Sequence, residues 1–258
     1  MKSKKRRALV CGASQGIGEA VVRGLADDGF EVTCLSRSLD KLEILAASIT
    51  GVSEPIAVDL KDGTGLVAGV KANIDKYGPF AVLINNAGGP PGGSLVDARV
   101  GEFEQALATH LFASHRLVNL VLPSMKESGW GRIINIISTS VRIPIPGLGV
   151  SNTVRGAMAS WAKTLANEVA PHGITVNNVL PGYTETERLL SLLQHRAKAA
   201  GVSEAEMRAQ MVAEVPTGRF GRPEEVAGLV RFLAGVETGA AYITGTSIPV
   251  DGGRTGSI

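Results

Sequence analysis

Three glycines near the start of the chain have the spacing of a phosphate-binding turn. Gly12, Gly16 and Gly18 follow the apolar run Ala8–Cys11, and a helical pattern begins at Ile17. Main-chain amides at a helix N-terminus carry the positive end of the helix dipole, and glycines let a pyrophosphate approach them. This turn therefore predicts a dinucleotide site. Its candidate binding residues are Gly12, Ser14, Gln15, Gly16, Ile17 and Gly18.

The end of the second apolar run bears on which dinucleotide is bound. In dinucleotide-binding folds, an acidic residue about twenty positions beyond the glycine turn binds the ribose 2′-hydroxyl of NAD. This chain has Ser36 and Arg37 there, and no acid. A guanidinium pairs with a 2′-phosphate, which a carboxylate would repel. We therefore expect NADP(H) in preference to NAD(H), unless Arg37 is only a solvated residue after a strand.

Short apolar runs alternate with helical patterns along the chain. The runs predicted as strands are Ala8–Cys11, Glu31–Leu35, Ile56–Val58, Val82–Ile84, Ile133–Ile137, Thr175–Leu180 and Ser247–Val250. The helical patterns are Ile17–Asp28, Leu42–Ile49, Phe103–Val121 and a segment that begins at Pro223. This alternation predicts one α/β domain with a doubly wound parallel sheet, covered on both faces. Pro249 should place the last strand at the sheet edge.

Two further segments complete the predicted domain. Residues 184–216 form a long amphipathic insertion, which we interpret as lid-like or as extra surface helices. Residues 1–7 carry five lysines and arginines and are predicted to be a solvated basic tail. Because the formal net charge is only +2, the body of the chain is not basic and nothing favours nucleic-acid binding.

Composition excludes several other classes of protein. No apolar stretch approaches 18 residues, so we expect no transmembrane helix. The two cysteines, Cys11 and Cys34, exclude a disulfide framework and favour a reducing, cytoplasmic setting with buried thiols. The four histidines have no metal-ligand spacing, so no metal site is expected.

Further motifs follow the glycine turn in order. They are Asn85-Asn86-Ala87-Gly88, Pro181-Gly182, Ile243-Thr244-Gly245 and Val250-Asp251-Gly252-Gly253. With these motifs, almost the whole chain resembles the short-chain dehydrogenase/reductase family, and within it the β-ketoacyl-acyl-carrier-protein reductases.

The resemblance implies a Rossmann-type fold, a cofactor site and a homotetramer. It places Asp59 and Leu60 near the adenine. It implies that Asn86, Ala87 and Gly88 back the cofactor, and that Pro181, Gly182, Thr184 and Thr186 contact the nicotinamide end. The tetramer would use the helices around Phe103–Met125 and Asn152–Ala170.

The resemblance fails at the catalytic residues. The family uses a tyrosine as proton donor, a lysine four residues later that lowers the tyrosine pKa and holds the ribose, a serine that polarises the carbonyl, and an asparagine that anchors a water relay. Ser138 occupies the serine position. Ser151 and Arg155 occupy the tyrosine and lysine positions, and His110 occupies the asparagine position. No Tyr-x3-Lys pair exists anywhere in the chain.

These replacements change the expected chemistry. A serine hydroxyl is a much weaker acid than a phenol, whose pKa is about 10. Arginine normally stays charged, so we expect Arg155 to hold ribose hydroxyls or an oxyanion rather than to relay protons. Ser151 and Arg155 lie four residues apart and share one helix face. Cofactor binding is therefore better supported than catalysis.

Three other residues are candidates for the missing roles. His110 can act as the acid, although its place in an apolar stripe favours a packed histidine. Tyr183 is a second candidate proton donor or pocket residue. Arg142 can bind an anionic part of the substrate, or can be an ordinary surface arginine.

The sequence leaves three functions open. The leading one is an NADP-dependent oxidoreductase with an atypical active site, acting on a small carbonyl or hydroxy compound such as a 3-oxoacyl group. The second is a catalytically silent dinucleotide-binding protein that senses redox state or supports a partner. The third is a non-redox enzyme that reuses the pocket, since fold alone does not decide function.

Overall fold

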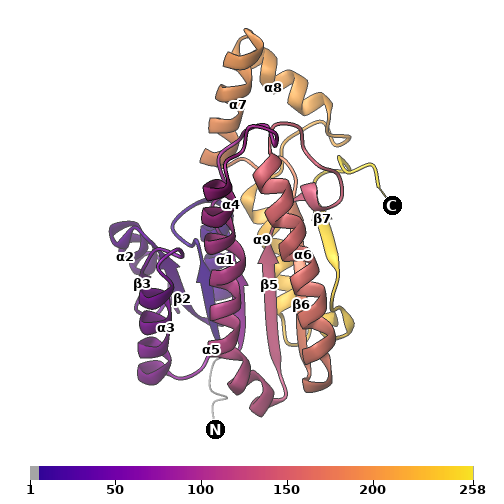
Figure 1. Cartoon of the computed structure of the whole chain (residues 1–258). Coiled ribbons are helices and arrows are strands. Elements are labelled where there is room, and N and C mark those ends of the chain that lie inside the picture. Colours follow the sequence, from indigo (N-terminus) through magenta and orange to yellow (C-terminus); the bar gives the residue numbers. More distant parts are fainter. Residues whose placement is uncertain (1–5, 258) are drawn as a thin grey trace.

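A seven-stranded parallel sheet forms the centre of the computed structural model, which describes residues 6–257 (Figure 1). The strands are β1 (Arg7–Cys11), β2 (Glu31–Ser36), β3 (Ile56–Ala57), β4 (Val82–Asn85), β5 (Gly131–Ile136), β6 (Ile174–Pro181) and β7 (Ser247–Val250). Their spatial order is β3-β2-β1-β4-β5-β6-β7, and every neighbouring pair is parallel. The predicted doubly wound sheet is thus confirmed, and Pro249 lies in an edge strand as expected.

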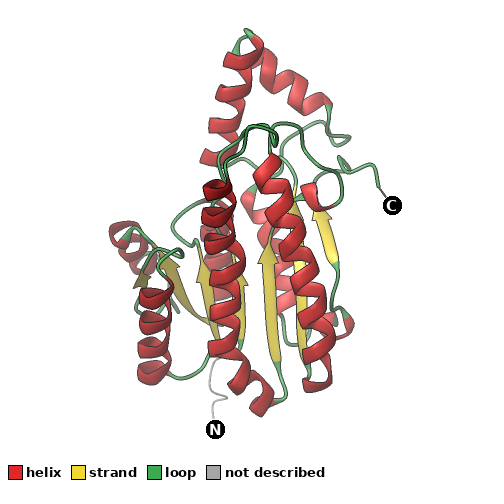
Figure 2. Ribbon diagram, viewed as in Figure 1, coloured by secondary structure: helices red, strands yellow, loops and turns green. Residues whose placement is uncertain are grey.

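Helices cover both faces of the sheet (Figure 2). They are α1 (Gly16–Asp27), α2 (Leu39–Ala47), α3 (Gly63–Tyr77), α4 (Val100–Leu107), α5 (Ala113–Ser128), α6 (Gly149–Val169), α7 (Glu187–Ala200), α8 (Glu204–Ala213) and α9 (Pro223–Ala234). Helices α1, α2 and α9 bury their apolar sides in one core layer. Helices α3, α5 and α6 do the same on the opposite face. The strands are buried from both sides, which explains their nearly continuous apolar sequence.

The order of the strands reverses between β1 and β4, which are neighbours in the sheet. Chain crossovers leave in opposite directions from these two strands, so a crevice opens at their carboxyl ends. Ligands of open α/β sheets bind at such a switch point. The turn after β1 and the loop after β4 both end there.

The insertion 184–216 folds as the helix pair α7 and α8, which projects beyond the carboxyl ends of the strands (Figure 1). The pair has a small apolar cluster of its own. That cluster contains Tyr183, Leu189, Leu193, Ala197, Met207, Met211, Val215 and Phe220. A lid role for this pair remains a prediction.

The helical stripe predicted over Phe103–Val121 is interrupted. Helices α4 and α5 are joined by one wider turn, Ala108–Phe112, with π geometry. Single π turns of this kind occur frequently at functional sites. His110 lies in the middle of this turn and is buried.

The predicted basic tail is wrong at its last residue. Lys2, Lys4 and Lys5 lie outside the described residues, but Arg7 begins β1 and is only 4% exposed. Its guanidinium donates to Glu31 Oε1 at 3.0 Å, Thr33 Oγ1 at 2.9 Å and Asn73 Oδ1 at 2.7 Å, and also to the main chain of Gly78. The charge run therefore ends inside the protein, because these partners compensate the buried charge.

Candidate active site and cofactor cradle

The glycine turn after β1 is held by close contacts within the protein. Gly12 and Gly16 have φ values of 59° and 58°, a region that L side chains rarely adopt. A Cβ on Gly12 would lie 2.7 Å from Asn86 O, and one on Gly18 would lie 2.0 Å from Gly12 O. The glycines are therefore required by the turn itself. Close approach of a pyrophosphate is therefore not the only reason for glycine at these positions.

Asn86 connects the loop after β4 to this turn. Its side-chain amide donates to the carbonyls of Cys11 and Gly12, each at 3.2 Å. On the other side, Thr186 Cγ2 would lie 3.1 Å from a Cβ on Gly16. The structure thus brings Asn86 and Thr186 against the glycine turn.

Gln15 joins the turn to two neighbouring helices. Its amide nitrogen donates to Glu187 Oε2 at 2.9 Å, and its carbonyl accepts from Lys41 Nζ at 3.1 Å. Glu187 is the first residue of α7, and Thr186 caps that helix by accepting from the amide of Leu189. The start of α7 is therefore fixed to the glycine turn.

Arg37, the residue predicted to favour NADP(H) over NAD(H), directly follows the carboxyl end of β2. The Arg37 side chain is 76% exposed and lies 3.9 Å from Asp59 Oδ2, measured from Nη1. An exposed ion pair of this length contributes little stability. The guanidinium therefore remains available to a phosphate, beside Ser36, at the end of the crevice where the resemblance places the adenosine.

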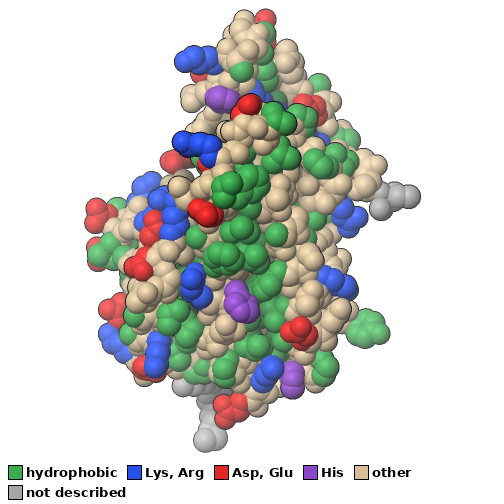
Figure 3. Space-filling model, viewed as in Figure 1, with side chains coloured by type: hydrophobic (Ala, Val, Ile, Leu, Met, Phe, Trp, Pro, Cys, Tyr) green, Lys and Arg blue, Asp and Glu red, His purple; other side chains and the backbone are tan. Residues whose placement is uncertain are grey.

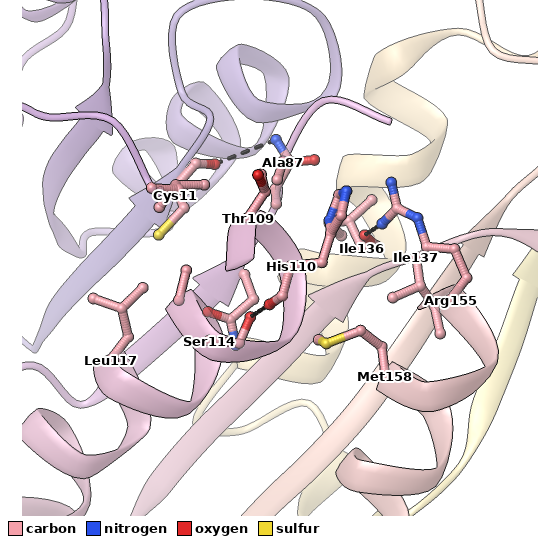
Figure 4. A pocket seen from close by; sticks show the side chains of 14 residues that line it. Cys11, Ala87, Thr109, His110, Ser114, Leu117, Ile136, Ile137, Arg155 and Met158 are labelled. Atoms are coloured by element: carbon pink, nitrogen blue, oxygen red, sulfur yellow. Dashed lines mark hydrogen bonds between the residues drawn. The ribbon is translucent and has the colours of Figure 1, made fainter. Parts of the chain in front are cut away.

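A narrow pocket at the switch point joins the cofactor loops to the catalytic positions (Figure 4). It is lined by Cys11, Leu60, Asn85, Asn86, Ala87, Thr109, His110, Ala113, Ser114, Leu117, Ile136, Ile137, Arg155 and Met158. Figure 4 shows the side chains of His110 and Arg155 next to each other and directed the same way. No acidic residue is among the lining residues.

His110 is buried and neutral in this pocket. Burial, and then the positive charge of Arg155, lower the pKa of the imidazole to about 2, although a hydrogen bond to the Gly88 backbone acts in the opposite direction. The Ser114 hydroxyl donates to the main-chain carbonyl of His110 at 2.6 Å. The neutral ring keeps one N–H, which can donate a hydrogen bond, but it lacks the acidic second proton of an imidazolium. The environment of His110 therefore does not favour its predicted role as a general acid at neutral pH. It is also more than a packed core residue, since its ring lines the pocket.

Arg155 reaches the same pocket from α6. It is 6% exposed, its Nη1 donates to the Ile136 carbonyl at 3.0 Å, and its Nε has no partner in the described structure. Burial, and then the charge of Arg188, lower the pKa of its guanidinium to about 10. The guanidinium therefore still carries its charge at neutral pH, as expected, although its pKa lies below the ordinary value.

The two serines lie beside this pocket without lining it. Ser138 follows β5, is half-buried, and its hydroxyl oxygen accepts from the amide of Ser140 at 3.1 Å. Ser151 is buried in the first turn of α6, one helical turn before Arg155. The loop after β6 supplies the remaining predicted residues: Pro181, Gly182, and Thr184, whose hydroxyl donates to the Gly182 carbonyl at 3.3 Å.

Two predicted substrate residues have other roles. Arg142 is exposed and donates to the main-chain carbonyl of Ser247 at 3.0 Å, so it is a surface arginine at the sheet edge. The Tyr183 hydroxyl contacts Glu214 Oε2 at 2.9 Å and accepts from Arg196 at 2.9 Å and Arg254 at 3.0 Å. Because these partners saturate the phenol, the prediction of Tyr183 as a pocket acid is wrong.

No motif in the sequence selects Arg188 or Ser114 as a site residue. Arg188 is in the first turn of α7, where it reads as one of several exposed charges in the insertion. The structure leaves Arg188 exposed, and its Nη2 donates to the Pro90 carbonyl at 2.7 Å. Ser114 lines the pocket, and its hydroxyl donates to the carbonyl of His110 four residues earlier, as serines in helices commonly do.

Comparison with known proteins agrees with the crevice and its motifs. A family model described as enoyl-(acyl carrier protein) reductase matches residues 12–255. The chain belongs to the short-chain dehydrogenase/reductase family. No helix among residues 6–257 is long and apolar enough to span a bilayer, and the same residues contain no cluster of three or more His, Cys, Asp or Glu suited to a metal ion.

Individual relatives cover essentially the whole chain. The 3-oxoacyl-(acyl-carrier-protein) reductase FabG of Vibrio cholerae is 33% identical over 253 residues, 98% of each protein. The structure is similar to that of YwfH, an NADPH dependent reductase involved in bacilysin biosynthesis, with a TM-score of 0.93, 30% identity, and coverage of 99% of this chain and 100% of the other. Actinorhodin polyketide ketoreductase with NADPH gives a TM-score of 0.90 at 32% identity, covering 98% of both chains.

Proposed function

We propose that this protein is an NADP-dependent reductase of small carbonyl compounds with an atypical active site. The observation that carries the proposal is the shared pocket at the switch point. There Cys11, Asn86 and Ala87 from the cofactor loops line the same space as His110 and Arg155 from the catalytic positions. A dinucleotide in the cradle would therefore present its reactive end to Arg155.

The residues present fit the cofactor. Gly12, Gly16 and Gly18 form a turn at the N-terminus of α1 whose amides suit a diphosphate. Arg37 suits a 2′-phosphate, and two of the similar structures are described with NADPH or as NADPH dependent. When bound, the reduced nicotinamide supplies a hydride to the carbonyl carbon of the substrate.

The protein's own residues then act on the carbonyl oxygen. The Ser138 hydroxyl, which already accepts from Ser140 N, still has its own proton to donate to that oxygen. Arg155 adds a fixed positive charge close by, which stabilises the negative charge that develops on the oxygen. The phenol that usually protonates this oxygen in the family is missing, so we expect slow reduction of simple ketones.

The two other functions are separated by one experiment. The protein is mixed with NADPH and a panel of ketones, oxo acids and 3-oxoacyl thioesters, and nicotinamide absorbance is followed while cofactor binding is measured by calorimetry. Turnover supports the proposed reductase. Tight NADPH binding without turnover on any compound would favour a silent dinucleotide-binding protein, and failure to bind any dinucleotide would favour a non-redox enzyme.

We further propose self-association through the face that carries α4, α5 and α6. Hydrophobic side chains gather on this face of the molecule (Figure 3). Among the exposed ones, Val100 and Phe112 lie in and next to α4, at 74% and 47% exposure. A surface of this kind favours an interface between protein chains. Light scattering after gel filtration tests the expected tetramer.

A further inference from the structure

Two arginines from different parts of the fold meet at the loop after β4. Arg155 belongs to α6 in the body of the domain, and Arg188 to the first turn of α7 in the projecting helix pair. A Cβ on Gly89 would lie 3.6 Å from Nη2 of Arg188 and 3.9 Å from Nη2 of Arg155. Both guanidinium groups therefore lie against the same glycine.

Neither arginine is neutralised by an acidic side chain within residues 6–257. The hydrogen bonds they make are to the main-chain carbonyls of Ile136 and Pro90. Arg155 is only 6% exposed, and its Nε has no hydrogen-bond partner among the described residues. Buried arginines usually occur with a carboxylate or another anion, because a lone buried charge is costly.

The other groups that face Arg155 do not supply the missing negative charge. The lining of the pocket contains no aspartate or glutamate. His110 is neutral there, and Arg188 adds a second positive charge that lowers the pKa of the Arg155 guanidinium beyond the effect of burial. The free protein thus holds two like charges close together, an arrangement that a bound anion would relieve.

We propose that Arg155 and Arg188 bind the carboxylate of the substrate, which makes small 2-oxo acids the preferred substrate class. This inference rests on the proposed carbonyl reduction, because in a 2-oxo acid the carboxylate is bonded directly to the carbonyl carbon that would be reduced. A guanidinium fork matches a planar carboxylate through two parallel hydrogen bonds, and both guanidinium groups lie against Gly89. Because Arg188 belongs to α7, the same anion would join the helix pair to the body of the domain.

A matched pair of substrates tests the charge directly. With NADPH held saturating, 2-oxobutanoate should be reduced with a kcat/KM at least about 10-fold above that of its methyl ester, because charge-assisted hydrogen bonds contribute on this scale. Arg188→Gln should remove most of this preference by lowering the kcat/KM of the acid towards that of the ester. The control variant Lys198→Gln removes one positive charge from the other end of α7 and should leave the kcat/KM of both substrates unchanged.

Calorimetry provides a readout that does not require turnover. Binding of 2-oxobutanoate to the protein saturated with NADP+ should weaken about 10-fold in Arg188→Gln, while the NADPH affinity of that variant stays unchanged. Weaker NADPH binding with unaltered acid binding would assign the pair to the cofactor diphosphate and overturn the proposal. Equal kcat/KM for acid and ester would overturn it while leaving the proposed reductase intact. Binding of the acid without any reduction would support the anion site and defeat the reductase.

Discussion

The Asn85 side-chain amide donates to the carbonyl oxygen of Asn135 at 2.8 Å, and the two residues are directly paired across β4 and β5. Asn135 in turn donates to Asn178 at 2.9 Å, and Asn178 donates to Ser247 at 3.0 Å. One chain of side-chain hydrogen bonds therefore crosses four strands, and it lies close to the carboxyl ends of β4 and β5, at which the site is built. Each amide in the ladder orients the next.

The middle of this ladder should be essential for stability. Asn135 is fully buried, so Asn135→Ala leaves the amide of Asn85 and the carbonyl of Asn178 without their partner. We expect a loss of about 3 kcal/mol in the free energy of unfolding, since each buried unsatisfied group costs about 1–3 kcal/mol. Urea denaturation measures it, with Asn119→Ala on the surface of α5 as control. A loss in the free energy of unfolding no larger than that of the control would show that the ladder does not stabilise the fold.

Arg7 should contribute far more stability than its neighbour. Arg7→Ala removes the donor shared by Glu31, Thr33 and Asn73, and we expect a loss of about 2–4 kcal/mol. Arg6→Ala removes only the stacking of an exposed guanidinium 4.4 Å above the Trp130 ring, worth about 1 kcal/mol or less. Thermal or urea unfolding of both variants gives the comparison. Equal losses in the free energy of unfolding would show that the hydrogen bonds of Arg7 add no more stability than an exposed arginine of the tail.

These two networks also show what the sequence could reveal. The strands, the edge position of Pro249 and the start of α9 at Pro223 follow from local periodicity and proline chemistry, and the structure confirms them. The burial of Arg7 could not be seen, because its partners Asn73 and Gly78 come 66 and 71 residues later and the neighbouring lysines imitate a tail.

The features of the candidate site also differ in how far the sequence reveals them. The glycine turn and Asn86 are local motifs, so the sequence could place them. The π turn around His110 leaves the apolar stripe of the helix almost unchanged, and therefore leaves no periodic signal. Arg188 is part of the site only because the first turn of α7 lies beside the loop that contains Pro90, a contact between residues 98 positions apart.

Cofactor preference should depend on one exposed charge. The protein should bind NADPH more tightly than NADH, and Arg37→Glu should reverse the order by replacing attraction to the 2′-phosphate with repulsion. We expect a change of about 10- to 100-fold in the ratio of dissociation constants, the scale of a charge-assisted pair. Calorimetry with both cofactors measures it, and Arg99→Glu reverses an equally exposed charge at the start of α4 as control. Equal affinities in the unmodified protein would refute the assignment.

His110 should make the fold sensitive to acid. Its pKa is lowered to about 2 in the folded protein, whereas the unfolded chain has an ordinary value near 6.5. Above pH 6.5 neither state carries the proton. Below it only the unfolded chain does, so the free energy of unfolding falls as the pH falls towards 2. The expected slope from this residue is about 1 kcal/mol per pH unit.

The variant His110→Asn should remove this part of the pH dependence. Urea denaturation at pH 7.5, 6 and 5 compares the unmodified protein with the variant, and the difference between them should shrink steadily as the pH is lowered. His172→Asn, at an exposed histidine, serves as the control. A constant difference across this range would mean that the His110 ring takes up its proton as easily when folded as when unfolded.

The two substituted catalytic positions, Ser151 and Arg155, remain four residues apart on α6. The double change Ser151→Tyr with Arg155→Lys restores a phenol and an amine at this spacing. General acid catalysis contributes about 10²–10⁴-fold, so reduction of a neutral ketone such as ethyl acetoacetate should rise by about 10²-fold if part of it is recovered. Reduction of 2-oxobutanoate should gain less, because lysine lacks the two-pronged geometry that arginine offers a carboxylate.

The triple form adds His110→Asn to the double change. Steady-state NADPH oxidation by the unmodified, double and triple forms shows which residue limits the reaction. A larger gain in the triple form would show that the neutral imidazole obstructs the restored pair. Brisk turnover by the unmodified protein that His110→Asn abolishes would make His110 the working acid, against the low pKa that burial and Arg155 impose on it. If neither variant reduces the ketone faster, the missing phenol does not limit the reaction. Arg155 would then serve the carboxylate of the substrate and not its carbonyl.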